Sequence, residues 1–170
     1  MSGSRRLFGT DGIRGVANVA PMTPELALRL GRSVGASLPG ASAGVAPAFV
    51  VGRDTRRSGR MLEAAFAAGL ASAGTDVRLA GVVPTPTVAC LTRCLGALGG
   101  AVISASHNPF ADNGIKLFDQ AGFKLDDAAE AAIEARLDDA DGEARPTGAA
   151  LGALADLDDA GERYVSFLLD

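Results

Sequence analysis

A dense run of polar side chains occurs at Ser104-Ala105-Ser106-His107-Asn108-Pro109 and continues in Asp112-Asn113-Gly114-Ile115-Lys116. A serine oxygen can carry a group covalently, an imidazole can move protons near neutral pH, and a lysine can balance negative charge. The run follows an apolar stretch, residues 101–103, and open α/β sheets bind ligands at the carboxyl ends of their strands. The sequence therefore predicts a functional site in this run.

The same run of residues has two other interpretations besides a functional site. Ser106 and His107 do not predict a serine hydrolase, because a nucleophile and its base rarely face each other when adjacent, and the Gly-x-Ser-x-Gly pattern is missing around Ser106. A structural interpretation makes Asn108-Pro109 and Asn113-Gly114 simple turns. A turn is favoured for Asn113-Gly114 alone, whereas the whole run favours a site.

Two further motifs place charged residues beside glycines. The first, Phe8-Gly9-Thr10-Asp11-Gly12-Ile13-Arg14-Gly15, fits a phosphate-cradling turn or an ordinary β-turn equally well. The second, Val51-Gly52-Arg53-Asp54-Thr55-Arg56 with Ser58-Gly59 after it, lies between a predicted strand and a predicted helix. Either a salt-bridged strand end with a helix cap or a direct functional role would explain this second motif.

The three motifs, in this order, resemble those of the α-D-phosphohexomutase family. The run around Ser106 is similar to that family's phosphoserine loop, and the motif that begins at Phe8 is similar to its opening motif. The resemblance extends from Phe8 to the segment containing Tyr164, which is nearly the whole chain. It implies that this chain is the N-terminal domain of a four-domain enzyme.

The resemblance implies specific roles in catalysis. Ser106, which directly precedes the histidine, is expected to carry the phosphoryl group and to be the chain's only metal ligand, through its phosphate; Ser104 is not. His107 and Lys116 are expected to handle protons and balance phosphate charge, and which of them is the general acid or base stays open. Arg14 is expected to be the fourth catalytic residue.

Substrate binding is also implied by the resemblance. Arg14 is expected to grip a phosphate or sugar oxygen, Lys116 to contact the substrate as well, and Asn108 to hold the loop by hydrogen bonds. The cofactors implied are one Mg²⁺ ion, whose aspartate ligands are absent from this chain, and a hexose bisphosphate activator. Asp138-Asp139-Ala140-Asp141 lacks the spacing of the family's metal-binding loop.

Within the family, the amino-acid sequences of the Phe8 and Ser106 motifs are most similar to those of phosphoglucosamine mutases. That resemblance implies interconversion of glucosamine 6-phosphate and glucosamine 1-phosphate through a phosphoserine and a bisphosphate intermediate. Phosphomannomutase or phosphoglucomutase activity, or non-catalytic phosphosugar binding, are the alternatives. The implied partners are a hexosamine phosphate and the remaining domains of the same enzyme, with a homodimer left open.

Composition narrows the classes of protein further. The 170 residues are 48% hydrophobic and 21% charged, which is typical of globular proteins. A net charge of −4 does not favour a nucleic-acid partner, and the apolar stretch at residues 95–103 is too short to span a membrane. We therefore expect a cytoplasmic protein, in which Cys90 and Cys94 are core or half-buried thiols.

Helix signals recur along the chain. Thr23-Pro24 and Thr85-Pro86 are typical of helix starts, because threonine caps the helix and proline fits its first turn. Apolar spacing and end signals predict helices at residues 23–38, 59–73, 85–96, 127–137 and 159–169.

Short apolar runs between these helices predict buried strands at residues 48–51, 77–83 and 101–103. A hairpin-like piece is expected at residues 115–118 and 123–125. This alternation predicts an α/β fold: a three-layer α/β/α domain with a mostly parallel, mixed sheet and helices on both faces. We expect residues 1–155 to form this domain and residues 156–170 to be a linker helix leading into a missing second domain.

Overall fold

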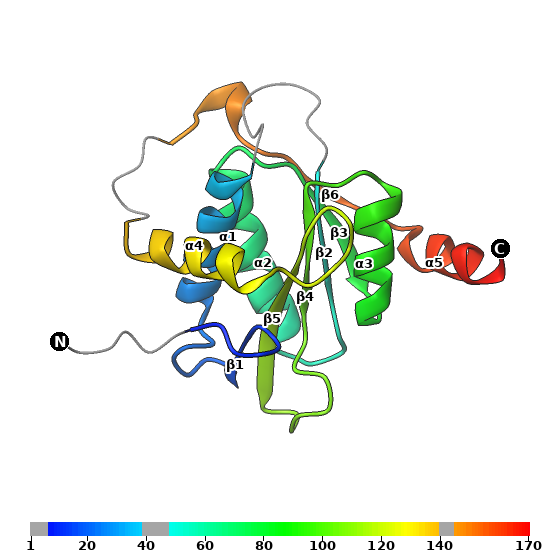
Figure 1. Ribbon diagram of the computed structural model, residues 1–170, viewed down its shortest axis with the longest axis horizontal. Coiled ribbons are helices and arrows are strands. Elements are labelled where there is room, and N and C mark those ends of the chain that lie inside the picture. Colours follow the sequence, from blue (N-terminus) through cyan, green and yellow to red (C-terminus); the bar gives the residue numbers. More distant parts are fainter. Residues whose placement is uncertain (1–6, 39–47, 140–144) are drawn as a thin grey trace.

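A six-stranded mixed sheet forms the centre of the computed structural model, which describes residues 7–38, 48–139 and 145–170 (Figure 1). The strand order is β1-β5-β4-β2-β3-β6. Strand β2 is parallel to β3 and β4, β3 is parallel to β6, and β5 is antiparallel to β4 and β1. The strands are β1 (Ile13–Val16), β2 (Phe49–Arg53), β3 (Val77–Val82), β4 (Gly99–Ile103), β5 (Asp112–Phe118) and β6 (Leu154–Asp156).

Helices cover both faces of this sheet, as the sequence predicts. Helices α1, α2 and α4 lie together on one side, and α3 and α5 lie on the other (Figure 1). Their bounds are α1 (Pro24–Ser37), α2 (Gly59–Ser72), α3 (Thr85–Cys94), α4 (Asp127–Asp139) and α5 (Ala160–Leu169), and a 3-10 turn spans Gly148–Ala150. The expected three-layer α/β/α arrangement is confirmed.

Local signals account for the principal helices. The Thr23 hydroxyl accepts a hydrogen bond from the Leu26 N–H at 3.3 Å, and Pro24 occupies the first turn of α1. Helix α2 ends before Gly74, whose φ of +87° suits glycine. A β-carbon at Gly31 would clash with the Phe66 carbonyl, so glycine permits the close packing of α1 on α2.

Two apolar cores lie on the two faces of the sheet. Residues on β4 alternate between them: Ile103 packs with Leu30 and Phe66 in the first core, and Val102 packs with Val88 in the second. This alternation follows from the two-residue period of a strand. Both faces of β4 are therefore buried, and the carboxyl ends of β2 and β4 are held side by side.

The structure corrects several expectations about strands. Strand β5 begins at Asp112, three residues earlier than expected, and residues 123–125 contribute only an isolated bridge between Phe118 and Lys124. The segment that forms strand β1 was expected to be a turn. Ile13 is its only inward-facing apolar side chain and it lies among glycines, so the sequence has no alternation of apolar and polar residues to indicate a strand. Strand β6 was not expected, because its three residues are all exposed and it is formed only by pairing with β3.

The carboxyl-terminal segment packs onto the sheet, and the two cysteines differ in exposure. Strand β6 pairs with β3 at the edge of the sheet, and Ala160 belongs to the second core. Cys90 is buried as expected, but Cys94, the last residue of α3, is exposed, with its Sγ 3.7 Å from that of Cys90. None of the described helices is both long enough and apolar enough to cross a bilayer.

Candidate active site

The loop containing Ser106 leaves the carboxyl end of β4 and returns into β5. The Asp54 N–H, just beyond β2, donates to the Ile103 carbonyl at 3.1 Å, so the segment after β2 lies directly beside this loop. Ser106 is exposed and has a φ of +56°, a left-handed conformation that is uncommon for residues other than glycine. Holding serine there costs about 1 kcal/mol or more, so surrounding contacts must maintain the conformation.

The two serines of the loop have different surroundings. The Ser106 Oγ lies 3.4 Å from the His107 Nδ1, and both side chains are exposed. The Ser104 hydroxyl instead donates to the Asp54 carboxylate at 2.7 Å and accepts the Ser106 N–H at 3.0 Å. Ser106 therefore has a hydroxyl that an incoming group can reach, whereas the Ser104 hydroxyl is held by structural hydrogen bonds.

Arg56 lies behind the loop with its side chain only 8% exposed. Its Nη1 donates to the carbonyls of Pro109 and Asp112 at 2.6 and 3.1 Å. Its Nη2 donates to the carbonyls of Ser106 and Asn108 at 3.0 and 2.9 Å. The guanidinium therefore ties four carbonyls of the loop to one rigid group.

Asp54 completes this support. One carboxylate oxygen accepts the backbone N–H of Arg56 at 2.9 Å, and the other accepts the Arg56 Nε–H at 3.0 Å. The same second oxygen accepts the Ser104 hydroxyl. Asp54 thus connects the arginine on one side of the loop to the serine on the other.

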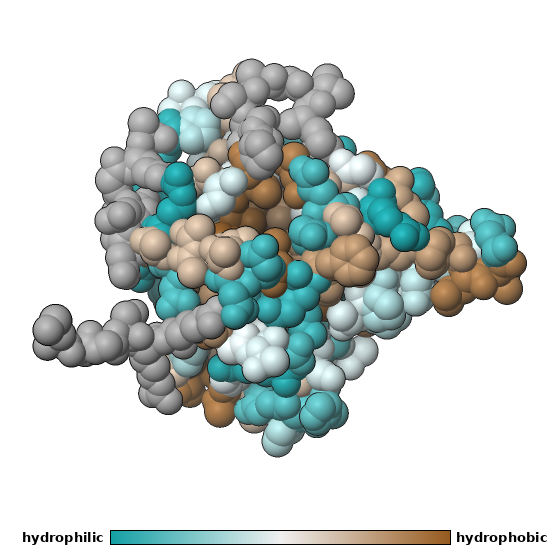
Figure 2. All heavy atoms as spheres, viewed as in Figure 1, coloured by the Kyte–Doolittle hydropathy of each residue, from teal (hydrophilic) through white to brown (hydrophobic). Residues whose placement is uncertain are grey.

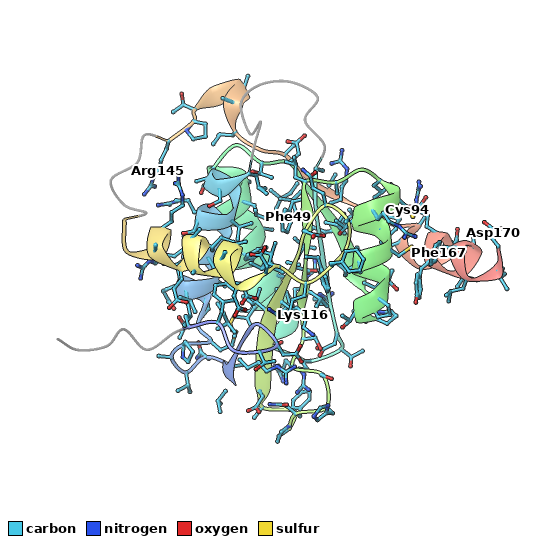
Figure 3. All side chains as sticks on the ribbon, viewed as in Figure 1. Phe49, Cys94, Lys116, Arg145, Phe167 and Asp170 are labelled. Carbon is cyan, nitrogen blue, oxygen red and sulfur yellow. The ribbon has the colours of Figure 1, made fainter. Side chains whose placement is uncertain are left out.

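Arg14 and Lys116 project from neighbouring strands on one face of the sheet. Arg14 pairs with Gly114, two residues from Lys116, and side chains two apart on a strand share a face. Figure 3 labels Lys116 on β5, beside β1. A β-carbon at Gly114 would come within 3.1 Å of the Arg14 Cγ, so glycine leaves room for the arginine.

Asp11 joins these two cations. Its carboxylate lies 2.8 Å from the Lys116 Nζ and 2.7 Å from the Arg14 Nη2. The hydrogen bond from Lys116 holds the pKa of the Asp11 carboxyl below its usual value, and the charges of Lys116 and Arg14 add to the effect. The Arg14 Nε is shielded from solvent and has no hydrogen-bond partner within the described structure.

Asn108 links Arg14 to the loop. Its side-chain oxygen accepts from the Arg14 Nη1 at 3.3 Å, and its amide nitrogen donates to the Asp112 carboxylate at 3.0 Å. The structure thus brings Arg14, Asn108 and Lys116 into one network through Asp11, and places His107 against Ser106.

The favoured interpretation of Asn113-Gly114 as a turn is wrong, because both residues lie in β5. The Asn113 side chain is fully buried, accepts the Gly114 N–H at 2.8 Å and donates to the Ser58 hydroxyl at 2.9 Å. Ser58 makes no side-chain bond to the helix it precedes. The Asn-Gly pair, which is typical of turns, here belongs to a strand in which neighbouring backbone atoms closely confine Gly114.

The second charged motif, residues 51–59, contains both a salt-bridged strand end and residues that contact the site. Arg53 pairs with Glu63 at 2.9 Å, which agrees with a salt-bridged strand end. Asp54 and Arg56, by contrast, bind the Ser106 loop, and sequence reasoning assigned neither of them a place in the site. A usable signal was present: both follow a strand predicted to lie in the same parallel sheet as residues 101–103, so they had to emerge at the same edge.

A metal ion does not fit the described residues on their own. Among residues 7–38, 48–139 and 145–170, no group of three or more His, Cys, Asp or Glu side chains is placed to hold one. This chain's oxygen and nitrogen groups around Ser106 suit a phosphate group instead, because an exposed hydroxyl, an imidazole and two cationic side chains lie along one edge of the sheet.

Known proteins resemble this chain in both sequence and structure. Residues 5–144 match the family described as phosphoglucomutase/phosphomannomutase, alpha/beta/alpha domain I. Phosphoglucosamine mutases from Sorangium cellulosum and Burkholderia cenocepacia are 54% and 55% identical to it, over 96% of this chain and 34% and 36% of their own lengths. The chain therefore spans about a third of the length of these curated relatives.

A solved structure supports the same relationship. A phosphoglucomutase/phosphomannomutase family protein from Burkholderia thailandensis matches with a TM-score of 0.76 and 29% identity, over 96% of this chain and 35% of its own. The family match covers most of the chain and includes all three motifs around the site. This chain therefore belongs to the phosphoglucomutase/phosphomannomutase family, as its α/β/α domain I.

Proposed function

We propose that this chain is the phosphoserine-bearing domain of a phosphoglucosamine mutase, which interconverts glucosamine 6-phosphate and glucosamine 1-phosphate. The observation that carries the proposal is the placement of Ser106 on a supported left-handed turn, with its hydroxyl exposed beside His107. The sugar preference is supported by the relatives that bear this name, at 54% and 55% identity.

The proposed reaction transfers one phosphoryl group out from Ser106 and one back. A hydroxyl of the sugar monophosphate attacks the phosphorus, a new P–O bond forms, and the bond from phosphorus to the Ser106 Oγ breaks. The sugar hydroxyl gives up its proton and the serine oxygen gains one, so the products are a sugar bisphosphate and unmodified serine. The other phosphate of the bisphosphate then returns to Ser106 by the reverse chemistry.

Each end of this transfer needs a proton carrier and each phosphate needs positive charge. The His107 Nδ1 lies 3.4 Å from the Ser106 Oγ, which makes His107 the candidate for exchanging a proton with it. Lys116 is the candidate at the sugar hydroxyl, since it provides three donors on a flexible stem. Arg14 holds a phosphate or sugar oxygen, and Asn108 keeps Arg14 close to the loop.

Magnesium belongs to the proposal through the chemistry of the phosphate on Ser106. When bound, the ion would neutralise charge on the transferring group. This chain would contribute only a phosphate oxygen on Ser106, and the aspartate ligands would come from the part of the relatives' length that this chain does not span. A hexose bisphosphate would act as activator by keeping Ser106 phosphorylated.

The proposal also includes further domains after α5. This helix extends from the body of the protein, and Val165, Leu168 and Leu169 are exposed along it (Figures 1 and 2). Apolar side chains on a projecting helix suit burial against another part of a protein. We propose that residues 156–170 lead into the next domain of a cytoplasmic enzyme, for which assembly as a homodimer stays open.

The test is made on the intact protein that contains this chain, at the length of its relatives. Mass spectrometry of its peptides should find a stoichiometric phosphate on Ser106 that is lost on addition of excess glucosamine 6-phosphate, as the bisphosphate forms. Ser106→Ala should abolish both. A phosphate found only on Ser104, or none in an active preparation, would contradict the proposal.

A further inference from the structure

The donors of the Arg56 guanidinium are all taken by Asp54 and by carbonyls of the Ser106 segment, so none is left for a ligand. A guanidinium carries five N–H donors. Nε donates to Asp54, Nη1 to two carbonyls and Nη2 to two more. With its side chain 8% exposed, Arg56 is enclosed by the structure that it supports. Any effect on chemistry at Ser106 must therefore act through the loop.

The loop itself has few other internal hydrogen bonds. Asn108 donates its N–H to the Ala105 carbonyl, and Asp112 donates its N–H to the Pro109 carbonyl. The carbonyls of Ser106, Asn108, Pro109 and Asp112 point to Arg56 instead. A lysine could not replace this contact, because its three donors spread from a single point and lack the planar fork of arginine.

The N–H and the carbonyl of Ser106 are both held by one hydrogen-bonded network of Arg56, Asp54 and Ser104. The Ser106 carbonyl accepts from Arg56, and the Ser106 N–H donates to Ser104, whose hydroxyl donates to Asp54. Asp54 in turn binds Arg56. The direction of the Ser106 hydroxyl depends on its left-handed backbone, so this network determines where the phosphoryl group points.

We infer that Arg56 is a positioning residue for phosphoryl transfer, which holds Ser106 in line with its acceptor through the backbone of the loop. The inference rests on the proposed function. In-line transfer depends steeply on geometry: a displacement of about 1 Å can cost on the order of a hundredfold in rate. Substrate binding, which falls to Arg14 and Lys116, does not depend on Arg56 directly.

The experiment compares Arg56→Lys with Arg57→Lys in the intact protein. Arg57 is the exposed neighbour, so its variant makes the same chemical change away from the loop. For Arg56→Lys we expect kcat to fall about a hundredfold while KM changes less than about threefold, because the charge is kept and the fork is lost. Arg57→Lys should leave both constants unchanged.

Two further measurements separate positioning from folding. The rate at which phosphorylated Ser106 loses its phosphate to added sugar phosphate, in a single turnover and per folded molecule, should fall as kcat does. Ser104→Ala removes the acceptor of the Ser106 N–H without touching Arg56, and should lower the same rate about tenfold or more with KM kept. This second variant decides the question if Arg56→Lys does not fold.

The outcomes distinguish this inference from the proposed function. Absence of phosphate on Ser106 in the active unmodified protein would overturn the proposed function and the inference with it. A phosphorylated, active unmodified protein, together with variants that keep kcat per folded molecule and lose only thermal stability, would overturn the positioning role alone. A rise in KM with kcat unchanged would also overturn the positioning role.

Discussion

The Lys116 ammonium and the Asp11 carboxylate form an ion pair with an Nζ–Oδ1 distance of 2.8 Å, and the other Asp11 oxygen binds Arg14. One anion thus lies between the two cations that we propose for phosphate binding. A phosphate that approaches them must compete with the carboxylate. The carboxylate also keeps the two cations together in the absence of phosphate.

Removing the charge of Asp11 should strengthen binding of phosphate to this chain. For Asp11→Asn we expect about fivefold tighter binding, because an exposed ion pair is worth about 1 kcal/mol or less. The measurement is an NMR titration with inorganic phosphate at low salt, following the amides of β1 and β5. Asp158→Asn, an exposed site near α5, makes the same charge change as a control, and equal gains in both variants would contradict a local effect.

Loss of either cation should reduce catalysis far more than stability. Lys116→Met and Arg14→Ala each break contacts to Asp11, whose side chain is 52% exposed, so the cost in stability should be under about 1 kcal/mol. Loss of a charge that stabilises the transferring group should cost roughly a hundredfold in kcat/KM. Thermal melts and activity per folded molecule check this, and a large fall in Tm with normal activity would make the residues structural.

Glu63 should make stability depend on pH. Glu63 lies in α2, where its burial raises the pKa of the carboxyl, although the hydrogen bond from Arg53 acts in the opposite direction. A raised pKa means that the folded state binds more protons than the unfolded state, so the unfolding free energy falls as pH rises from the ordinary glutamate value toward the raised one.

Glu63→Gln isolates this contribution, because amide and carboxyl have nearly the same shape. The unmodified chain should lose stability relative to the variant as pH increases from about 4 upward. Denaturant unfolding at a series of pH values gives the difference directly. A difference that grows with pH in favour of the unmodified chain would mean that the Arg53 pair outweighs burial.

The sugar preference should favour the amino sugar. In the intact protein, we expect kcat/KM for glucosamine 6-phosphate to exceed the values for mannose and glucose 6-phosphates. Specificity is the ratio of these constants, measured with the same activator. A higher value for mannose 6-phosphate would assign the protein to phosphomannomutases, and a higher value for glucose 6-phosphate to phosphoglucomutases.

The 170-residue chain should fold alone but show no turnover. Its two cores and six-stranded sheet are contained in the chain, whereas the described residues hold no carboxylate cluster for a metal ion. Circular dichroism followed by an assay with glucosamine 6-phosphate, Mg²⁺ and a bisphosphate activator checks both parts. Turnover above background would show that the chain already contains a complete site.

The sequence by itself determined the helices, the central strands β2, β3 and β4, and the chemistry of single segments. Caps such as Thr23, glycine stops such as Gly74, and apolar runs such as residues 101–103 act between neighbours in the chain, so they can be read without a fold. The same holds for the Ser106 motif, since its hydroxyl and imidazole are adjacent. The α/β layering followed from the alternation of these elements.

Only the tertiary structure decided how the site is held together. Arg56 lies 50 residues before Ser106 in sequence, and its role appears only when β2 and β4 end side by side. Asn113-Gly114 resembles a turn until the neighbours that confine β5 are known, and Asp11 becomes a bridge only when β1 pairs with β5. The physical reason is that hydrogen bonds and ion pairs between distant segments leave no local pattern, because their geometry depends on strand order and register.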